Sequence, residues 1–207
     1  KIIRALLKQA RPPQDRIRPV SLRPIVERSI ELAQLPENFK VEIDFENSDA
    51  EALCEKDQMI QVLLNLLINA KHALESLAGQ RQPSIKIVCA QRKLSSLDTN
   101  SSDPVMESSM VRALKPQSYW MLRITDNGTG IAKEDQKKLF EPFFSTKETG
   151  KGTGLGLSVS LGIIKDHKGH IEVDSTEGKG TTFTINLPAL PMSDEEEALE
   201  RLVQLTL

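Results

Sequence analysis

Apolar residues recur along this chain at two spacings, one typical of helices and one typical of strands. Helical spacing predicts helices at about 22–34 and 57–77, with Ser21 and Asp57 as the expected N-caps, and a third from Leu155 to Lys165. Alternating apolar and polar residues predict strands at about 40–46, 84–91, 119–125, 170–175 and 181–187. In the first of these, Val41, Ile43 and Phe45 should point inward. This mixture predicts an α/β fold.

The predicted helix at 57–77 is almost entirely apolar, so we expect it to be buried on most sides. Asn65 and Asn69 interrupt its leucines one turn apart, and an unpaired buried amide costs about 1–3 kcal/mol. Either these amides bind neighbouring backbone, or one stripe of the helix faces a cleft. There the Asn69 carbonyl oxygen suits a Mg²⁺ ion that bridges phosphates. Lys71 and His72 are further candidate phosphate ligands, although His72 equally suits a surface or core position.

A glycine-rich loop precedes the third predicted helix, with Gly150, Gly152, Gly154 and Gly156 at every second position. Backbone without Cβ atoms can lie close to a ligand, and the N–H groups that begin a helix attract phosphate. A flexible linker is the alternative, but linkers seldom enter a helix directly. The loop matches neither a P-loop nor a dinucleotide fingerprint, and protein-serine kinase motifs are absent. It therefore predicts another nucleotide-binding architecture.

Residues 126–131, Asp-Asn-Gly-Thr-Gly-Ile, follow the predicted strand at 119–125. Asn127-Gly128 alone is typical of a type I′ hairpin turn, but residues 132–139 have helical spacing rather than strand spacing. Asp126 is therefore also a candidate acceptor for an exocyclic amine. Gly128 and Gly130 would leave room for a flat base.

Composition limits the class of protein. With 207 residues and 39% apolar content, the chain can bury one core of about 150 residues plus appendages. A net charge of −2 gives no field that gathers nucleic acid or anionic membrane, so we expect neither as a partner. Cys54 and Cys89 share no metal or disulfide motif, and we expect buried free thiols in a reducing compartment. No apolar run is long enough to span a membrane. We expect a cytoplasmic location for this chain, and membrane anchoring of the intact protein stays open.

Several motifs occur in one order along the chain: Asn65-x3-Asn69, Asp126-x-Gly-x-Gly130, Phe140-x2-Phe143-Phe144, Gly152-Thr-Gly-Leu-Gly156 and Gly178-x-Gly-Thr181. Together they resemble the ATP-binding catalytic domain of sensor histidine kinases, within the wider group that holds gyrase, MutL and the ninety-kilodalton heat-shock chaperone. Residues 143–147 and 154–158 are most similar to nitrogen-regulator-type kinases. The resemblance implies an α/β sandwich of two layers, with three helices over a mixed sheet and ATP between a helix and a mobile lid. Phe140, Phe143 and Phe144 would anchor this lid, which would run to about Thr153.

The resemblance also implies the roles of individual residues. Asn69 would bind Mg²⁺, Asp126 would accept from the adenine amine, and Thr181 would support the water network around adenine. The implied catalytic residues are Asn65, Asn69, Lys147 and Lys151. The implied nucleotide-binding residues are Asn65, Asn69, His72, Asp126, Gly128, Gly130, Ile131, Phe140, Phe144, Gly152, Thr153, Gly154, Leu155, Gly156, Leu157 and Thr181.

The implied function is transfer of the ATP γ-phosphoryl group to a histidine on a separate dimerisation domain of the same protein, with a response regulator receiver domain as the next partner. The usual phosphoacceptor motif, His-Glu-x-x-x-Pro, is absent from this chain. ATP-hydrolysing relatives carry a glutamate at position 65, whereas the asparagine here cannot accept a proton, so we expect weak ATPase activity. The alternative is a non-catalytic module in which ATP closes the lid and changes contact with a partner.

The same resemblance implies how the chain is divided into segments. We expect residues 1–20 to be the end of a dimerisation helix and a linker, residues 21–190 the ATP-binding domain, and residues 191–207 a short C-terminal helix. Within the domain, the serine-rich stretch at 93–118 is too long for an ordinary hairpin turn, and we expect a mobile insertion.

Overall fold

The structure is a computed structural model, and it describes residues 17–46, 50–77, 79, 81–93, 118–145 and 153–189. The expectations for the N-terminal helix, the core of the 93–118 insertion, the middle of the lid and the C-terminal helix lie outside these residues.

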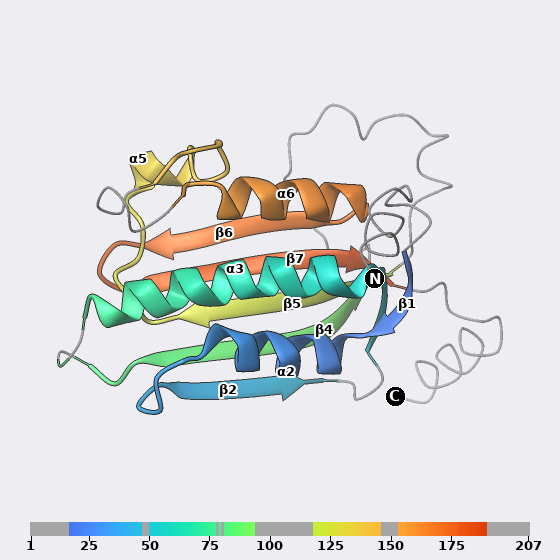
Figure 1. Cartoon of the computed structure of the whole chain (residues 1–207), viewed down its shortest axis with the longest axis horizontal. Coiled ribbons are helices and arrows are strands. Elements are labelled where there is room, and N and C mark those ends of the chain that lie inside the picture. The colour runs from blue at the N-terminus through green and yellow to red at the C-terminus, as the bar shows by residue number, and fades with distance from the viewer. Residues whose placement is uncertain are drawn as a thin grey trace, which may run out of the picture.

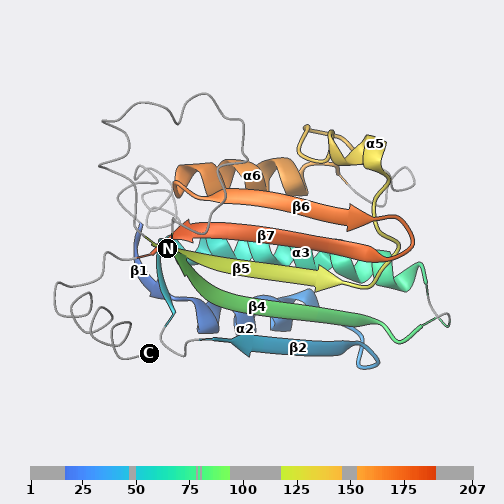
Figure 2. The ribbon, with the colours of Figure 1, turned by 180° about the vertical axis from the view of Figure 1, so that it is seen from behind.

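A mixed sheet of five strands forms one layer of the molecule (Figures 1 and 2). Its order is β2-β4-β5-β7-β6; β2 and β4 are parallel, and the other neighbours are antiparallel. The strands are β2 (Lys40–Phe45), β4 (Ser84–Lys93), β5 (Ser118–Asp126), β6 (His170–Thr176) and β7 (Gly180–Pro188). All five lie where period-two alternation predicts them, which confirms that part of the sequence interpretation.

Helices cover one face of this sheet (Figure 1). They are α2 (Leu22–Ala33), α3 (Lys56–Glu75) and α6 (Gly156–Asp166). The two-layer α/β architecture predicted from the sequence is therefore confirmed. A short helix, α5 (Lys133–Gln136), lies beside the end of β6, and a separate antiparallel pair joins β1 (Arg18–Ser21) to β3 (Glu51–Cys54). We did not predict β1 and β3, because four residues are too few for a periodic signal.

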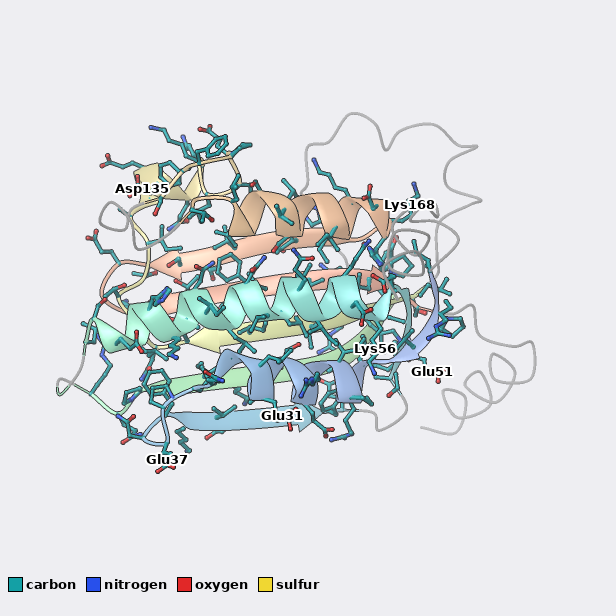
Figure 3. The ribbon with its side chains drawn as sticks, in the orientation of Figure 1. Glu31, Glu37, Glu51, Lys56, Asp135 and Lys168 are labelled. Carbon is teal, nitrogen blue, oxygen red and sulfur yellow. The ribbon has the colours of Figure 1, made fainter. Side chains whose placement is uncertain are left out.

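Helix α3 runs through the centre of the core, as its apolar sequence predicts. Leu63, Leu66 and Leu67 are almost fully buried, in the same cluster as Leu122 and Ile185 from the central strands. Charged side chains such as Glu31, Glu51 and Lys168 lie at the outside of the molecule (Figure 3). Cys54 and Cys89 are buried free thiols, as expected, and burial raises the pKa of each to about 12. Both are therefore inert thiols at neutral pH.

Two local predictions differ from the structure. Helix α3 begins at Lys56, and Glu55 rather than Asp57 is its N-cap, since the Glu55 carboxylate accepts the N–H groups of Asp57 and Gln58 at 3.2 and 2.9 Å. Strand β2 lies at the edge of the sheet, so Ile43 remains 43% exposed although its alternation pattern predicted an inward position. Ser21 occupies the N-cap position of α2 without a capping bond from its side chain.

Candidate functional site

A cavity of about 960 Å³ opens beside α3, between the first turn of α6 and the ends of β5 and β7. Its lining includes most of the sequence-predicted site residues, which are far apart along the chain: Asn65, Asn69, His72, Asp126, Gly130, Ile131, Phe144, Thr153, Gly154, Gly156, Leu157 and Thr181. The fold thus brings the separate motifs to one place. Sequence reasoning missed several small or apolar lining residues, such as Ala73 and Phe183, which carry no chemical signal of their own.

Asn65 joins α3 to the beginning of α6. Its Nδ2 donates to the Gly156 carbonyl oxygen at 3.1 Å and to Ser160 Oγ at 3.2 Å, and Ser160 Oγ donates to the same carbonyl at 2.8 Å. A carbonyl oxygen can only accept, so these contacts determine which end of the amide is nitrogen. Both Nδ2 hydrogens are used, and Asn65 has only its Oδ1 acceptor left for a ligand.

The polar residues after Asn65 on α3 separate into two groups. Asn69 and His72 line the cavity. Lys71 does not, because its ammonium group donates to the carbonyl oxygen of Gln34 at 2.9 Å. Gln34 ends α2 in a left-handed conformation, with φ of 46°. Lys71 therefore links α2 to α3 and is not a phosphate ligand, in contrast to the possibility raised by its sequence position.

Asp126 ends β5 with its carboxylate at the cavity, where it is only 6% exposed. Burial raises its pKa to about 6, and bonds from the backbone N–H groups of Gly128 and Thr181 oppose that rise. The Gly128 N–H lies 2.8 Å from Asp126 Oδ1. At neutral pH the carboxylate is mainly ionised, so it offers acceptors only.

Gly128 and Gly130 let backbone segments pack closely together, and Gly130 also lines the cavity. A Cβ on Gly128 would lie 2.7 Å from the Cβ of Ala73, and one on Gly130 would lie 2.1 Å from the Thr176 carbonyl oxygen. Gly130 also has φ of +67°, which favours glycine. Gly128 is not among the lining residues, and its role is to let the segment after β5 approach α3.

Residues 143–144 and 153–154, on either side of the segment expected to form the lid, meet beside the cavity. Phe143 N–H donates to the Gly154 carbonyl oxygen at 3.0 Å, and the Phe143 side chain is 76% exposed. Phe144 lines the cavity, whereas Phe140 packs against the core and Leu155 faces outward. The remaining predicted residues, Lys147, Lys151 and Gly152, lie outside the described residues.

A hydrogen-bond network that the sequence does not predict joins the lining residues Ile131 and Thr181 to neighbouring segments. Ser175 Oγ donates to the Gly180 carbonyl oxygen, accepts from Ile131 N–H, and contacts Thr181 Oγ1, each at 2.9 Å. Gln136 Nε2 donates to the carbonyl oxygens of Ile131 and Ser175 at 2.8 and 2.9 Å. Sequence alone offers little signal for this network, because a serine near the end of a strand is common.

The cavity suits a polyphosphate with a hard metal ion better than a metal held by protein alone. Within the described part of the chain, no group of three or more His, Cys, Asp or Glu side chains could hold a metal. Asn65 and Asn69 instead bring two neutral amides to the lining. Mg²⁺ commonly takes few protein ligands and completes its octahedron with phosphate oxygens and water, so these residues fit the ion.

Comparison with known proteins identifies the family. The profile of histidine kinase-, DNA gyrase B- and HSP90-like ATPases matches residues 54–191. The signal transduction histidine-protein kinase AtoS of Escherichia coli K12 is 35% identical over 94% of this chain, and the sensory histidine kinase/phosphatase NtrB of Vibrio alginolyticus is 34% identical over 82%. This chain spans 28% of the length of AtoS and 43% of that of NtrB.

The fold comparison agrees. A mycobacterial sensor histidine kinase, MprB, superposes with a TM-score of 0.63 and 22% identity, covering 84% of this chain and 100% of that one. None of the helices in the described ranges has the length and apolar character needed to cross a membrane.

The sequence matches show the family. The chain belongs to the histidine kinase-, DNA gyrase B- and HSP90-like ATPases, and it is an ATP-binding catalytic domain of the sensor histidine kinase type.

Proposed function

We propose that this chain binds ATP with Mg²⁺ in the cavity beside α3 and passes the γ-phosphoryl group to a histidine on a separate dimerisation domain. The observation that carries the proposal is the convergence of Asn69, Asp126 and Gly156 on one cavity of about 960 Å³. This volume is large enough for a nucleotide. A carboxylate acceptor lies at one part of the lining and the beginning of a helix at another, which suits a base and a polyphosphate respectively.

The base belongs beside Asp126. The carboxylate is the buried acceptor of the lining, and Gly128 and Thr181 orient it through their N–H groups. An adenine amine would donate to it, and Thr181 would accept from the base or from a water molecule next to it. Ile131 and Phe183 supply apolar lining near these polar groups.

The phosphates belong near the first turn of α6 and the two asparagines of α3. Asn69 would hold Mg²⁺, and the Oδ1 atom of Asn65 would accept from water bound to the ion, because its Nδ2 already binds Gly156 and Ser160. When bound, Mg²⁺ neutralises charge on the phosphate oxygens. We propose Lys147 and Lys151 as γ-phosphate ligands by resemblance alone.

Catalysis would rest on positioning, because position 65 carries an amide where ATP-hydrolysing relatives carry a glutamate that serves as the base for water. The Asn65 amide cannot take a proton at neutral pH and is tied to α6. Water is therefore a poor nucleophile in this cavity, and the better one is an imidazole brought by another domain. We expect slow release of free phosphate by the isolated chain. A turnover comparable to that of a dedicated ATPase would contradict the proposal.

The partners follow from this chemistry. The first is the dimerisation domain of the same protein, and the next is a response regulator receiver domain that takes the phosphoryl group. The test is to mix this chain with its separately purified dimerisation domain and ATP labelled in the γ-phosphate. Label on the partner histidine supports the proposal. ATP binding without transfer supports the non-catalytic module instead.

A variant of Asn69 tests the metal role. Asn69→Ala should weaken nucleotide binding mainly when Mg²⁺ is present, because the amide oxygen would contact the ion rather than the base. Calorimetric titrations of ADP with Mg²⁺ and with EDTA measure this difference. An equal loss under both conditions would remove Asn69 from the metal site.

A further inference from the structure

The hydroxyl group of Ser175 makes as many hydrogen bonds as a hydroxyl group can. It lies at the end of β6, outside the cavity lining, and three polar groups surround its Oγ atom at 2.9 Å: the Gly180 carbonyl oxygen, the Ile131 N–H and Thr181 Oγ1. A hydroxyl group has one proton and two lone pairs. The Gly180 carbonyl can only accept, so it takes the Ser175 proton, and the Ile131 N–H takes one lone pair.

The third contact then has only one arrangement. The remaining lone pair of Ser175 must receive the proton of Thr181 Oγ1. In the reverse arrangement, Ser175 would donate to Thr181 and face the Gly180 carbonyl at 2.9 Å with two oxygen lone pairs opposed. The Thr181 hydroxyl group is therefore a donor toward Ser175, and it has only lone pairs to offer elsewhere.

Thr181 presents the accepting side of its hydroxyl group to the cavity. Its side chain is 5% exposed and lines the cavity beside Asp126, and its backbone N–H bonds to the Asp126 carboxylate. Thr181 Oγ1 and the ionised Asp126 carboxylate are thus two neighbouring acceptors. A ligand edge that donates a hydrogen bond fits this pair, whereas a ligand edge that carries a carbonyl oxygen is repelled.

We propose that Ser175 is a positioning residue that sets the proton of Thr181, so that this edge of the cavity accepts only and selects a purine with an amino group at C6 over one with an oxygen there. This inference rests on the proposed nucleotide function. Because Ser175 accepts the Thr181 proton, the Thr181 hydroxyl group cannot donate a hydrogen bond to a 6-oxo purine.

The test compares ADP with inosine diphosphate, whose base carries oxygen at C6, by calorimetric titration in the presence of Mg²⁺. We expect the unmodified chain to bind ADP about tenfold or more tightly than inosine diphosphate. Ser175→Ala frees the Thr181 proton, so the ratio of the two affinities should fall by about tenfold. Ser175→Thr keeps the hydroxyl group and should retain the ratio.

Two further variants separate proton orientation from general loosening. Gln136→Ala removes bonds to the Ile131 and Ser175 carbonyls but leaves the pair of hydroxyl groups, so it should change both affinities by the same factor. Thr181→Val keeps the shape of the side chain without its oxygen. It should weaken ADP and strengthen inosine diphosphate, so that the ratio of the two affinities falls, and it tests the inference even if Ser175→Ala does not fold.

The possible results test the proposed nucleotide function and the role of Ser175 separately. An unmodified chain that binds neither nucleotide overturns the proposed function. An unmodified chain that binds both equally, or a ratio that Ser175→Ala and Thr181→Val leave unchanged while ADP still binds, overturns only the role of Ser175. A fall in the ratio with Ser175→Ala, together with its retention in Ser175→Thr, supports it.

Discussion

Asn65 Nδ2 lies 3.1 Å from the carbonyl oxygen of Gly156, and this bond ties the middle of α3 to the first residue of α6. The carbonyl also accepts from Ser160 Oγ, which in turn accepts from Asn65. Three polar groups at the base of the cavity therefore satisfy one another. The two helices that carry the proposed phosphate ligands are held together at the cavity itself.

Replacing the amide by a carboxylate should break this link. In Asn65→Asp an oxygen replaces Nδ2 and faces the Gly156 carbonyl, so we expect the free energy of unfolding to fall by about 1–3 kcal/mol at neutral pH. Ser160→Ala is the matched control, because it leaves the bond from Asn65 to Gly156 and should cost about 1 kcal/mol. Urea denaturation measures both values. An Asn65→Asp chain at least as stable as Ser160→Ala would contradict this account.

Asp126→Asn should weaken nucleotide binding without unfolding the chain. The neutral amide loses the charged acceptor for the adenine amine, which predicts about 10- to 150-fold weaker affinity for ADP. Asp174→Asn removes an exposed carboxylate from β6 and should leave the affinity unchanged. Calorimetry compares the two variants, and an unaltered affinity in Asp126→Asn would remove this carboxylate from the site.

The raised pKa of Asp126 also predicts how stability depends on pH. The pKa is about 6 in the folded chain and 3.8 ordinarily, so the folded chain binds this proton more tightly than the unfolded chain. The resulting contribution to the free energy of unfolding is fully present below about pH 4 and is lost as pH rises through 6. The difference corresponds to about 3 kcal/mol. Denaturation of Asp126→Asn beside the unmodified chain should show the variant gaining relative stability by up to this amount between pH 4 and pH 7. A constant difference across that range would contradict the prediction.

Gly154→Ala should separate the two described flanks of the lid. Its φ is +67°, and a Cβ there would lie 2.4 Å from the Phe143 carbonyl carbon, so the bond between Phe143 and Gly154 cannot form unchanged. We expect ADP affinity to fall by about tenfold. Gly178→Ala has a similar φ of +77° with nothing near the added atom, so it should cost about 1–2 kcal/mol of stability with little effect on affinity. Equal effects of the two variants on affinity would refute this role for Gly154.

His167 should prove more important for stability than its exposed neighbour. Its Nε2 accepts from Glu55 N–H at 2.8 Å and its Nδ1 bonds the Ile163 carbonyl at 2.7 Å, which joins the start of α3 to the end of α6. His167→Phe leaves the Glu55 N–H unsatisfied and removes one of the two bonds to the Ile163 carbonyl oxygen, which still accepts the His167 backbone N–H. Thermal or urea unfolding should therefore show a loss of about 1–3 kcal/mol. His170→Phe, at an exposed site, should stay within about 0.5 kcal/mol. If both variants unfolded alike, the buried imidazole would have no linking role.

The sequence by itself determined the three long helices, the five strands of the main sheet and the family. Apolar periodicity places α3 in the core and locates the five strands, because burial of a face imposes its spacing on the chain. The ordered motifs from Asn65 to Thr181 identify the family, since each needs a particular small or polar residue at a particular place. These are local requirements, and a linear pattern records them.

Only the tertiary structure decided which groups meet and which of them donate. Asn65 and Gly156 are 91 positions apart, Glu55 and His167 are 112 apart, and no local pattern encodes either pair. Lys71 is adjacent to His72 in sequence, yet it binds Gln34 away from the cavity. The proton of Thr181 is set by Ser175 on a neighbouring strand. Hydrogen-bond direction depends on every partner around an atom, so it appears only when distant segments have packed together.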